Sequence, residues 1–136
     1  MPHLIIEHSS NVAALVDIDA LVVAVHDAAL ATGIAPLDAL RTRAAGLEHY
    51  AIADRDPTNA FVAVTARFGA GRSDVDQRRL LDALMAAVER TLGEACRSVM
   101  VSVEFQEIDP DRRINQNHLR AVIAERQANI PNHETE

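Results

Sequence analysis

The first half of the chain has the order strand, helix, strand. Residues 3–9 alternate weakly between apolar and polar types, which predicts a strand. Residues 17–32 carry apolar side chains at helical spacing, and Gly33 and Pro36 follow at positions that end a helix. Residues 38–50 predict a second strand. Because this helix is long enough to cross between two strands of the same direction, the segment predicts a parallel βαβ unit.

The second half repeats this order after a cluster of turn residues at 54–59. Residues 61–68 form a nearly continuous apolar run, which predicts a strand. Ser73 and Asp76 have the spacing of a helix N-cap, and the apolar stripe that follows continues to a helix end near Gly93. Residues 99–106 alternate as in a strand with one buried face. The two βαβ halves, of roughly 50 residues each, are a repeat of elements and not of residues.

The repeated order predicts an α+β fold with one four-stranded sheet. Two helices can cover only one face of such a sheet, and we expect both on the same face. Both central strands, 3–9 and 61–68, look apolar on both faces, so the second face also needs to be buried. We therefore expect copies of the chain to associate through their sheets, as a closed ring.

The C-terminal part of the chain is less regular. Residues 110–117 predict a turn with a short strand around 113–115, and residues 118–128 predict a short helix. Residues 129–136 are polar and predict a flexible tail. We expect residues 2–128 to form a single domain, in keeping with a length of 136 residues.

Composition excludes several classes of function. The net charge of −7 and four aromatic residues argue against a nucleic-acid binder, which needs a basic surface or stacking platforms. No apolar run is long enough to span a membrane, and no secretory signal is visible, so we expect a cytoplasmic protein. Cys96 stands alone, and the six histidines show no paired metal-ligand spacing, so we expect neither metal nor cofactor. An anionic ligand would need local arginines to offset the overall charge.

Pro2 directly follows the initiator Met1 and precedes the first strand. If Met1 is removed, Pro2 presents a secondary amine, which can act as a base. Burial or a neighbouring cation would have to lower the pKa of this amine for catalysis at neutral pH. A proline after the start codon is by itself a weak signal.

Several segments in one order resemble the 5-carboxymethyl-2-hydroxymuconate Δ-isomerase family of the tautomerase superfamily. They are Pro2, Ala31-Thr32-Gly33-Ile34-Ala35-Pro36-Leu37, Leu40-Arg41-Thr42-Arg43, Gly69-Ala70-Gly71-Arg72-Ser73, Ser102-Val103-Glu104-Phe105 and Asn115-Gln116-Asn117. The resemblance covers residues 2 to about 120. It implies the tautomerase-like duplicated βαβ fold, a homotrimer, and active sites built between neighbouring subunits.

The resemblance also implies chemistry without a cofactor. Pro2 would be the general acid and base, Arg72 its catalytic arginine, and Arg41 the next candidate; Arg43 and His3 would lie near the substrate. The ligand would be a small unsaturated di- or tricarboxylate, since guanidinium groups bind carboxylates in bidentate fashion. The implied reaction converts 5-carboxymethyl-2-hydroxymuconate to its 2-oxo-3-ene isomer in the degradation of homoprotocatechuate, from 4-hydroxyphenylacetate.

Two alternatives remain open at this point. One keeps the fold and changes the reaction, to hydration or dehalogenation of an unsaturated acid. The other is a binding module without catalysis that retains Met1, because an acylated proline nitrogen cannot shuttle a proton. The chain also departs from some relatives by lacking tryptophan and by having Ala44-Ala45-Gly46-Leu47 after the arginine pair, which points to a smaller pocket wall or a different substrate.

Overall fold

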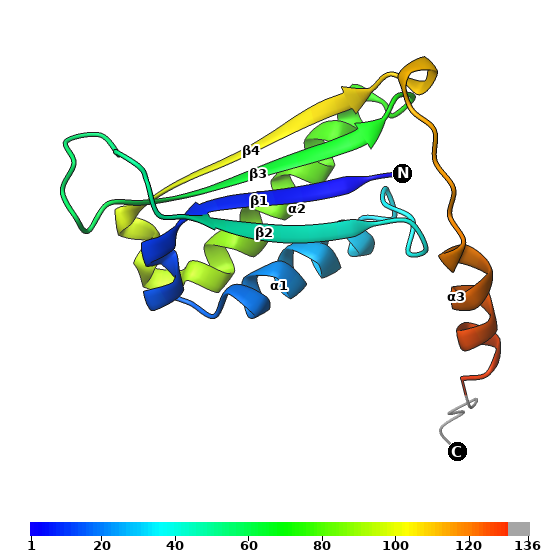
Figure 1. Ribbon diagram of the computed structural model, residues 1–136, viewed down its shortest axis with the longest axis horizontal. Helices are drawn as coiled ribbons and strands as arrows, with labels where there is room; N and C mark the ends of the chain where they lie inside the picture. The colour runs from blue at the N-terminus through cyan, green and yellow to red at the C-terminus, as the bar shows by residue number, and fades with distance from the viewer. Residues whose placement is uncertain (131–136) are drawn as a thin grey trace.

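A four-stranded mixed sheet forms one layer of the molecule, and two antiparallel helices form the other (Figure 1). The computed structural model describes residues 1–130. In chain order, the helices and strands are β1 (His3–Ser9), η1 (Ser10–Ala14), α1 (Ile18–Ala31), β2 (Arg41–Leu47), β3 (Ala60–Gly69), α2 (Asp74–Leu92), η2 (Gly93–Ser98), β4 (Val99–Ile108), η3 (Pro110–Arg112) and α3 (Leu119–Ala128).

The sheet has the order β2-β1-β3-β4 and confirms the duplicated βαβ arrangement. β1 pairs with β2 in parallel, β3 pairs with β4 in parallel, and the two central strands are antiparallel. In this register His3 lies opposite both Arg41 and Arg67. The beginnings of β1 and β2 therefore meet the ends of β3 and β4 at one end of the sheet.

The core lies between the sheet and the pair α1 and α2. Alternate residues of the central strands point toward the helices and are buried, as strand geometry requires. The helices contribute their apolar stripes to the same layer. The largest side chains of this core are Phe68, Leu4, Ile6, Leu21, Leu80 and Leu84. The prediction that both helices cover one face of the sheet is confirmed (Figure 1).

The opposite face of the sheet is covered by no helix among the described residues. Its side chains include Ile5 and Phe61, which are half-buried, but also the exposed Glu7 and Arg67. The prediction that both central strands are apolar on both faces is therefore wrong in part. The apolar runs in the sequence hid the polar residues that alternate with them on this open face.

Two boundaries differ from the sequence predictions. β2 begins at Arg41 rather than at residue 38, because the carbonyl oxygen of Pro36 accepts hydrogen bonds from the backbone N–H groups of Ala39 and Leu40 and closes a turn. The short strand predicted around 113–115 is wrong: the segment is extended but pairs with no strand, because η3 turns the chain away after β4.

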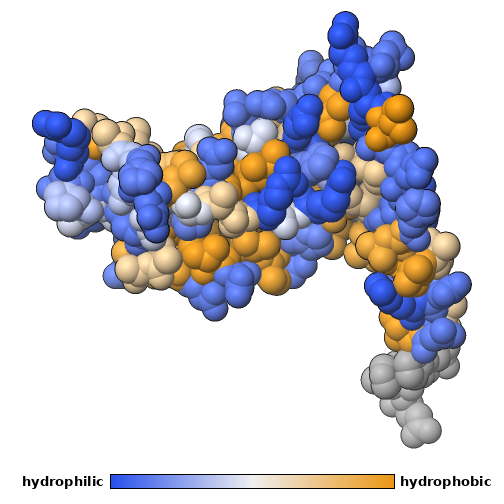
Figure 2. Space-filling model, in the orientation of Figure 1, coloured by the Kyte–Doolittle hydropathy of each residue, from blue (hydrophilic) through white to orange (hydrophobic). Residues whose placement is uncertain are grey.

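The predicted helix at 118–128 is confirmed as α3, which projects from the body of the molecule (Figure 1). Apolar side chains gather on it, among them the exposed Leu119 and Val122 (Figure 2). Residues 131–136, most of the predicted flexible tail, lie outside the described residues. No helix within residues 1–130 has both the length and the apolar character to cross a membrane.

Candidate active site

The N-terminal residues lie at the end of the sheet where four strand ends meet. Pro2 is buried, and its carbonyl oxygen accepts a hydrogen bond from the backbone N–H of Arg41 at 3.3 Å. The Nη2 atom of Arg41 donates to the carbonyl oxygen of Met1 at 3.1 Å. That oxygen belongs to the Met1–Pro2 peptide group, so the Arg41 guanidinium contacts the peptide group that contains the nitrogen of Pro2.

Arg72 approaches the same end from the loop between β3 and α2. Its guanidinium donates to the carbonyl oxygen of Gly69 at 3.0 Å and to that of Ile34 at 3.4 Å. It also lies 4.8 Å from the centre of the Phe68 ring, a favourable cation–π contact. Gly71 has a φ of +110°, which glycine adopts without strain and which turns the chain toward α2. These contacts hold the side chain in one orientation.

His3 lies between two guanidinium groups on the open face of the sheet. Its Nε2 is 3.1 Å from Nη2 of Arg41, and its Nδ1 is 3.1 Å from Nη1 of Arg43. Burial, and then the charges of Arg41, Arg43 and Arg67, lower the pKa of His3 to about 4. A neutral imidazole has only one acceptor nitrogen, so only one of the two guanidinium groups can donate to it. The prediction that Arg41 and Arg43 share one face is confirmed.

Arg113 is a residue of this site that the sequence patterns did not indicate. Its Nη1 is buried and has no hydrogen-bond partner in residues 1–130. Its guanidinium packs against Gly69, where an added Cβ would stand only 2.8 Å from Nη2. Gly69 thus makes room for the side chain of Arg113. In the sequence, Arg113 is marked only by the adjacent arginine pair Arg112-Arg113, which does not indicate that Arg113 points toward this site.

A cavity of about 150 Å³ adjoins these residues. Its lining consists of Met1, Leu37, Asp38, Ala39, Leu40, Arg41, Gln116 and Asn117. The Asp38 carboxylate accepts a hydrogen bond from Nε of Arg120 at 2.7 Å, and the Asp38 carbonyl oxygen accepts one from the Asn117 side chain at 2.8 Å. The acidic group in the lining is therefore paired with a cation from α3.

The electrostatics of this end favour anions. Within residues 1–130, no carboxylate lies within ion-pair distance of Arg41, Arg43, Arg72 or Arg113. Burial, followed by the charges of Arg113, Arg41, Arg72 and Arg120, lowers the pKa of the Met1 amine. Burial and the neighbouring Arg113 also lower the pKa of Arg72. The arrangement can bind a multiply charged carboxylate and lowers the pKa of an amine placed there.

The start of α2 does not contribute an anion-binding group to this site. The Ser73 hydroxyl accepts a hydrogen bond from the backbone N–H of Asp76 at 3.1 Å. Asp74 and Asp76 both lie in the first turn, where their negative charge already offsets the helix dipole. An anion at this helix start would meet carboxylates, so the guanidinium groups remain its binding partners. Among the described residues, no group of three or more His, Cys, Asp or Glu side chains could hold a metal ion.

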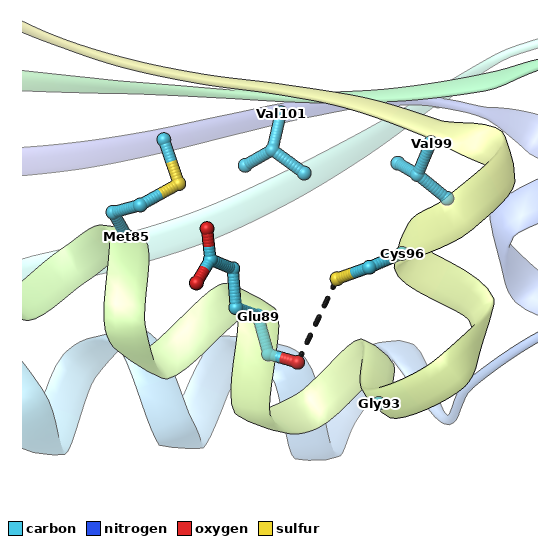
Figure 3. A pocket seen from close by; sticks show the side chains of 6 residues that line it. All are labelled: Met85, Glu89, Gly93, Cys96, Val99 and Val101. Carbon is cyan, nitrogen blue, oxygen red and sulfur yellow. Dashed lines mark hydrogen bonds between the residues drawn. The ribbon is translucent and has the colours of Figure 1, made fainter.

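A larger cavity, of about 470 Å³, lies between α2, η2 and the beginning of β4 (Figure 3). Met85, Glu89 and Cys96 contribute to its lining, together with Gly93 and the β4 residues Val99 and Val101. The Cys96 thiol donates to the backbone carbonyl of Glu89 at 3.7 Å. Burial and the Glu89 charge raise the pKa of Cys96, which disfavours the reactive thiolate. This lining contains no cation and does not suit an anionic substrate.

The family is settled by comparison with known proteins. The family model for 5-carboxymethyl-2-hydroxymuconate isomerase matches residues 2–123. The chain belongs to the 5-carboxymethyl-2-hydroxymuconate isomerase family. It is therefore an enzyme of the isomerase class. The Escherichia coli 5-carboxymethyl-2-hydroxymuconate Δ-isomerase is 30% identical over 125 residues, which cover 90% of this chain and 99% of that protein.

Solved structures agree with this assignment. The crystal structure of a 5-carboxymethyl-2-hydroxymuconate isomerase from Deinococcus radiodurans R1 is 32% identical, with a TM-score of 0.81 over 90% of this chain and 93% of that one. A fused 4-OT asymmetric trimer is 15% identical, with a TM-score of 0.65 over 89% of this chain and 98% of that one. The latter similarity concerns the fold alone and supports the predicted tautomerase-like α+β architecture.

Proposed function

We propose that this isomerase converts 5-carboxymethyl-2-hydroxymuconate to its 2-oxo-3-ene isomer, with Pro2 as the general acid and base. The single observation that carries the proposal is the set of three guanidinium groups, from Arg41, Arg72 and Arg113, around the N-terminal residues. Together with the family assignment, it offers one buried position for an amine and several for carboxylates. The substrate carries three carboxylates, and this end of the sheet is its natural place.

The mechanism requires removal of Met1, since only then is Pro2 a secondary amine. The neutral amine takes the proton of the 2-hydroxyl group, a carbonyl forms at C2, and the double bond moves from C2–C3 to C3–C4. The electron pair of the former C4–C5 double bond accepts the proton at C5 from the prolinium ion. The amine is thereby regenerated, and the reaction needs neither oxidant nor reductant. A positioned proton-transfer group of this kind contributes about 10²- to 10⁴-fold to the rate.

The surroundings of Pro2 suit both halves of this proton transfer. The Met1 amine, one residue upstream, already has a pKa lowered by burial and by four arginines, and the same charges would act on a Pro2 amine. The Arg41 donor that now binds the Met1 carbonyl would become available to the substrate. Arg72 would stabilise the negative charge that develops on the 2-oxygen, while Arg43 and His3 border the substrate from the open face.

The proposed assembly is a homotrimer joined through the open face of the sheet. Half-buried Ile5 and Phe61 and exposed Met100 would become buried there. His3, Arg41 and Arg43 gather at one end of this face. Contact with a second subunit would then place that subunit's side chains beside the site. The trimeric fused 4-OT has the same fold, which supports this arrangement by analogy only.

The proposed setting is the breakdown of aromatic acids through homoprotocatechuate in the cytoplasm.

Ultraviolet spectroscopy tests the activity itself. Protein whose intact mass shows the loss of Met1 is mixed with 5-carboxymethyl-2-hydroxymuconate, and the dienol absorbance should decay with turnover. A 3-haloacrylate and an acetylenic acid are assayed in parallel. Turnover of either of those alone, with no decay of the dienol, would replace the proposed reaction with dehalogenation or hydration.

A further inference from the structure

The guanidinium group of Arg113 is partly buried against Gly69, unlike that of a typical surface arginine. Its Nη1 is buried and finds no acceptor among the described residues. A buried donor without a partner is costly, and charged donors are costlier than neutral ones. The neighbouring Arg112 behaves in the ordinary way: its side chain is 82% exposed and pairs with Asp109 at 3.1 Å. The Arg113 guanidinium therefore carries a charge that no carboxylate of residues 1–130 neutralises.

The position of Arg113 says which kind of acceptor fits. Its guanidinium lies on one side of Gly69, whose carbonyl oxygen binds the guanidinium of Arg72. Two cations held this close, with no carboxylate within ion-pair distance of either in residues 1–130, form a binding place for an anion. Planar guanidinium groups favour a carboxylate over a spherical ion because the fork geometry matches two oxygens.

We propose that Arg113 binds the carboxymethyl arm of the substrate and thereby sets the preference of this enzyme for a tricarboxylate over a dicarboxylate. The proposal rests on the proposed function. Arg41 lies next to the Met1–Pro2 peptide group, and Arg72 is the arginine assigned to the reacting oxygen. Arg113 lies against Gly69, beside Arg72, whereas Arg43 contacts His3 on the open face, so we assign the additional carboxylate to Arg113. The extended linker between η3 and α3 is what carries it to this place.

The local charges add a second consequence. After burial, Arg113 is the strongest of the influences that lower the pKa of the Met1 amine. Removing its charge should raise the pKa of an amine at this position. The base then remains protonated to higher pH, so the acidic limb of the kcat/KM profile should move upward in pH.

The test compares Arg113→Gln with Arg112→Gln as the matched control on two substrates. One is 5-carboxymethyl-2-hydroxymuconate, and the other is 2-hydroxymuconate, the same dienol without the carboxymethyl arm. The two substrates are compared at a pH above the acidic limb of the profile, where the base is neutral in every variant. There we expect Arg113→Gln to lower kcat/KM about 10- to 100-fold on the first substrate, in line with loss of a hydrogen bond to a charged group, and by less than about threefold on the second. Equal losses on both, or no loss on either, would overturn the proposal. Arg112→Gln should match the wild type.

A binding measurement separates this proposal from the proposed function. Tricarballylate, a saturated tricarboxylate, should raise the melting temperature of wild type and Arg112→Gln but not of Arg113→Gln. If the wild type turns over neither dienol, the proposed function fails. In that case, loss of the tricarballylate-induced rise in melting temperature in Arg113→Gln would still support an anion site at Arg113. The assignment of this site to the carboxymethyl arm of the substrate would be withdrawn. An unchanged shift in that variant would overturn the site itself. Arg113→Lys, which keeps the charge, controls for a loss of folding.

Discussion

The two ends of the sheet occupy equivalent places in the repeat but differ in charge. Each parallel pair has a strand that follows a helix: β2 begins at Arg41, next to His3, and β4 begins at Val99, next to Ala60. Cavities of about 150 and 470 Å³ open at these two places. The smaller one adjoins a group of arginines, whereas the larger one has Glu89 and Cys96 in an otherwise apolar lining.

The two ends also differ in what precedes their central strands. Met1 precedes Pro2, and its removal would expose an amine. Ala60 is preceded by a loop, and its own end is closed by polar contacts: the backbone N–H of Phe61 donates to the Ser9 hydroxyl at 3.0 Å, and the Asn11 side chain donates to the Asn59 carbonyl at 2.8 Å. The βαβ scaffold therefore occurs twice, but within residues 1–130 the cluster of arginines lies at only the end of the sheet that contains Pro2.

The largest difference in kcat/KM between substitutions at the two ends of the sheet is expected for Arg72. Arg72→Ala removes the guanidinium proposed to stabilise charge on the 2-oxygen, so we expect kcat/KM to fall about 10²- to 10³-fold. Arg97→Ala removes an exposed arginine from the opposite end and should leave kcat/KM unchanged.

The comparison of these two variants requires that both are folded. Arg72 also contacts Phe68 and two carbonyl oxygens, so circular dichroism melting should accompany the kinetics. Arg72→Lys, which keeps the charge but loses the fork, should fall between wild type and Arg72→Ala. Equal activities for Arg72→Ala and Arg97→Ala would remove the distinction between the ends.

Breaking the pair between Arg120 and Asp38 should have a smaller effect. Arg120→Ala leaves the Asp38 carboxylate uncompensated in the lining of the smaller cavity, where it would repel an anionic substrate. We expect KM to rise about 3- to 10-fold, as for a partly exposed ion pair worth about 1 kcal/mol. Adding Asp38→Asn to the same protein should bring KM back toward the wild-type value. A KM that stays high in the double variant would mean that α3 acts through packing instead.

The pH dependence of stability should reveal the cations around His3. The pKa of about 4 for folded His3 lies below its ordinary value of 6.5. Between these pH values the unfolded chain binds more protons than the folded chain, so the free energy of unfolding falls as pH drops from 6.5 to 4.

Urea denaturation at several pH values in this window measures the effect. His3→Gln should lose less of its free energy of unfolding than the wild type does as the pH falls, because it lacks the group that takes up the proton. His118→Gln, an exposed histidine in the linker before α3, serves as the matched control and should behave as the wild type. Parallel pH dependences for wild type and His3→Gln would contradict the account of this cluster.

The smallest effect is expected at the larger cavity. Cys96→Ala and Glu89→Gln should each change kcat/KM by less than about twofold, because the cavity that they line contains none of the arginines of the candidate site. The same ultraviolet assay provides the measurement. A large loss of activity in Cys96→Ala, in protein that melts normally, would shift the candidate site to the opposite end of the sheet.

The sequence predicted the sheet and helices well because their signals are local. Helical spacing, the Ser73 cap and the glycines near the helix ends each depend on a few adjacent residues, and the structure has its elements close to those places. The open face was predicted less well. Whether Glu7 or Arg67 alternates with apolar neighbours on that face depends on the register between strands, which an apolar run does not reveal.

The candidate site was predicted only in part, because some of its residues lie in local sequence segments and others depend on long-range contacts. Pro2, Arg41 and Arg72 stand in recognisable segments, and the structure brings them to one end of the sheet. Arg113 stands in a linker without periodicity, and its place depends on how η3 turns the chain after β4. The Asp38–Arg120 pair joins residues 82 positions apart, and nothing in either segment indicates the other.

In the proposed mechanism, the amine of Pro2 at the cationic end of the sheet performs the proton transfer. The most direct measurement is the rate of 5-carboxymethyl-2-hydroxymuconate decay with wild type and with Pro2→Ala, both shown by intact mass to lack Met1. We expect rapid decay with wild type and a rate about 10²- to 10⁴-fold lower with Pro2→Ala. A folded Pro2→Ala variant with the full rate would contradict this mechanism.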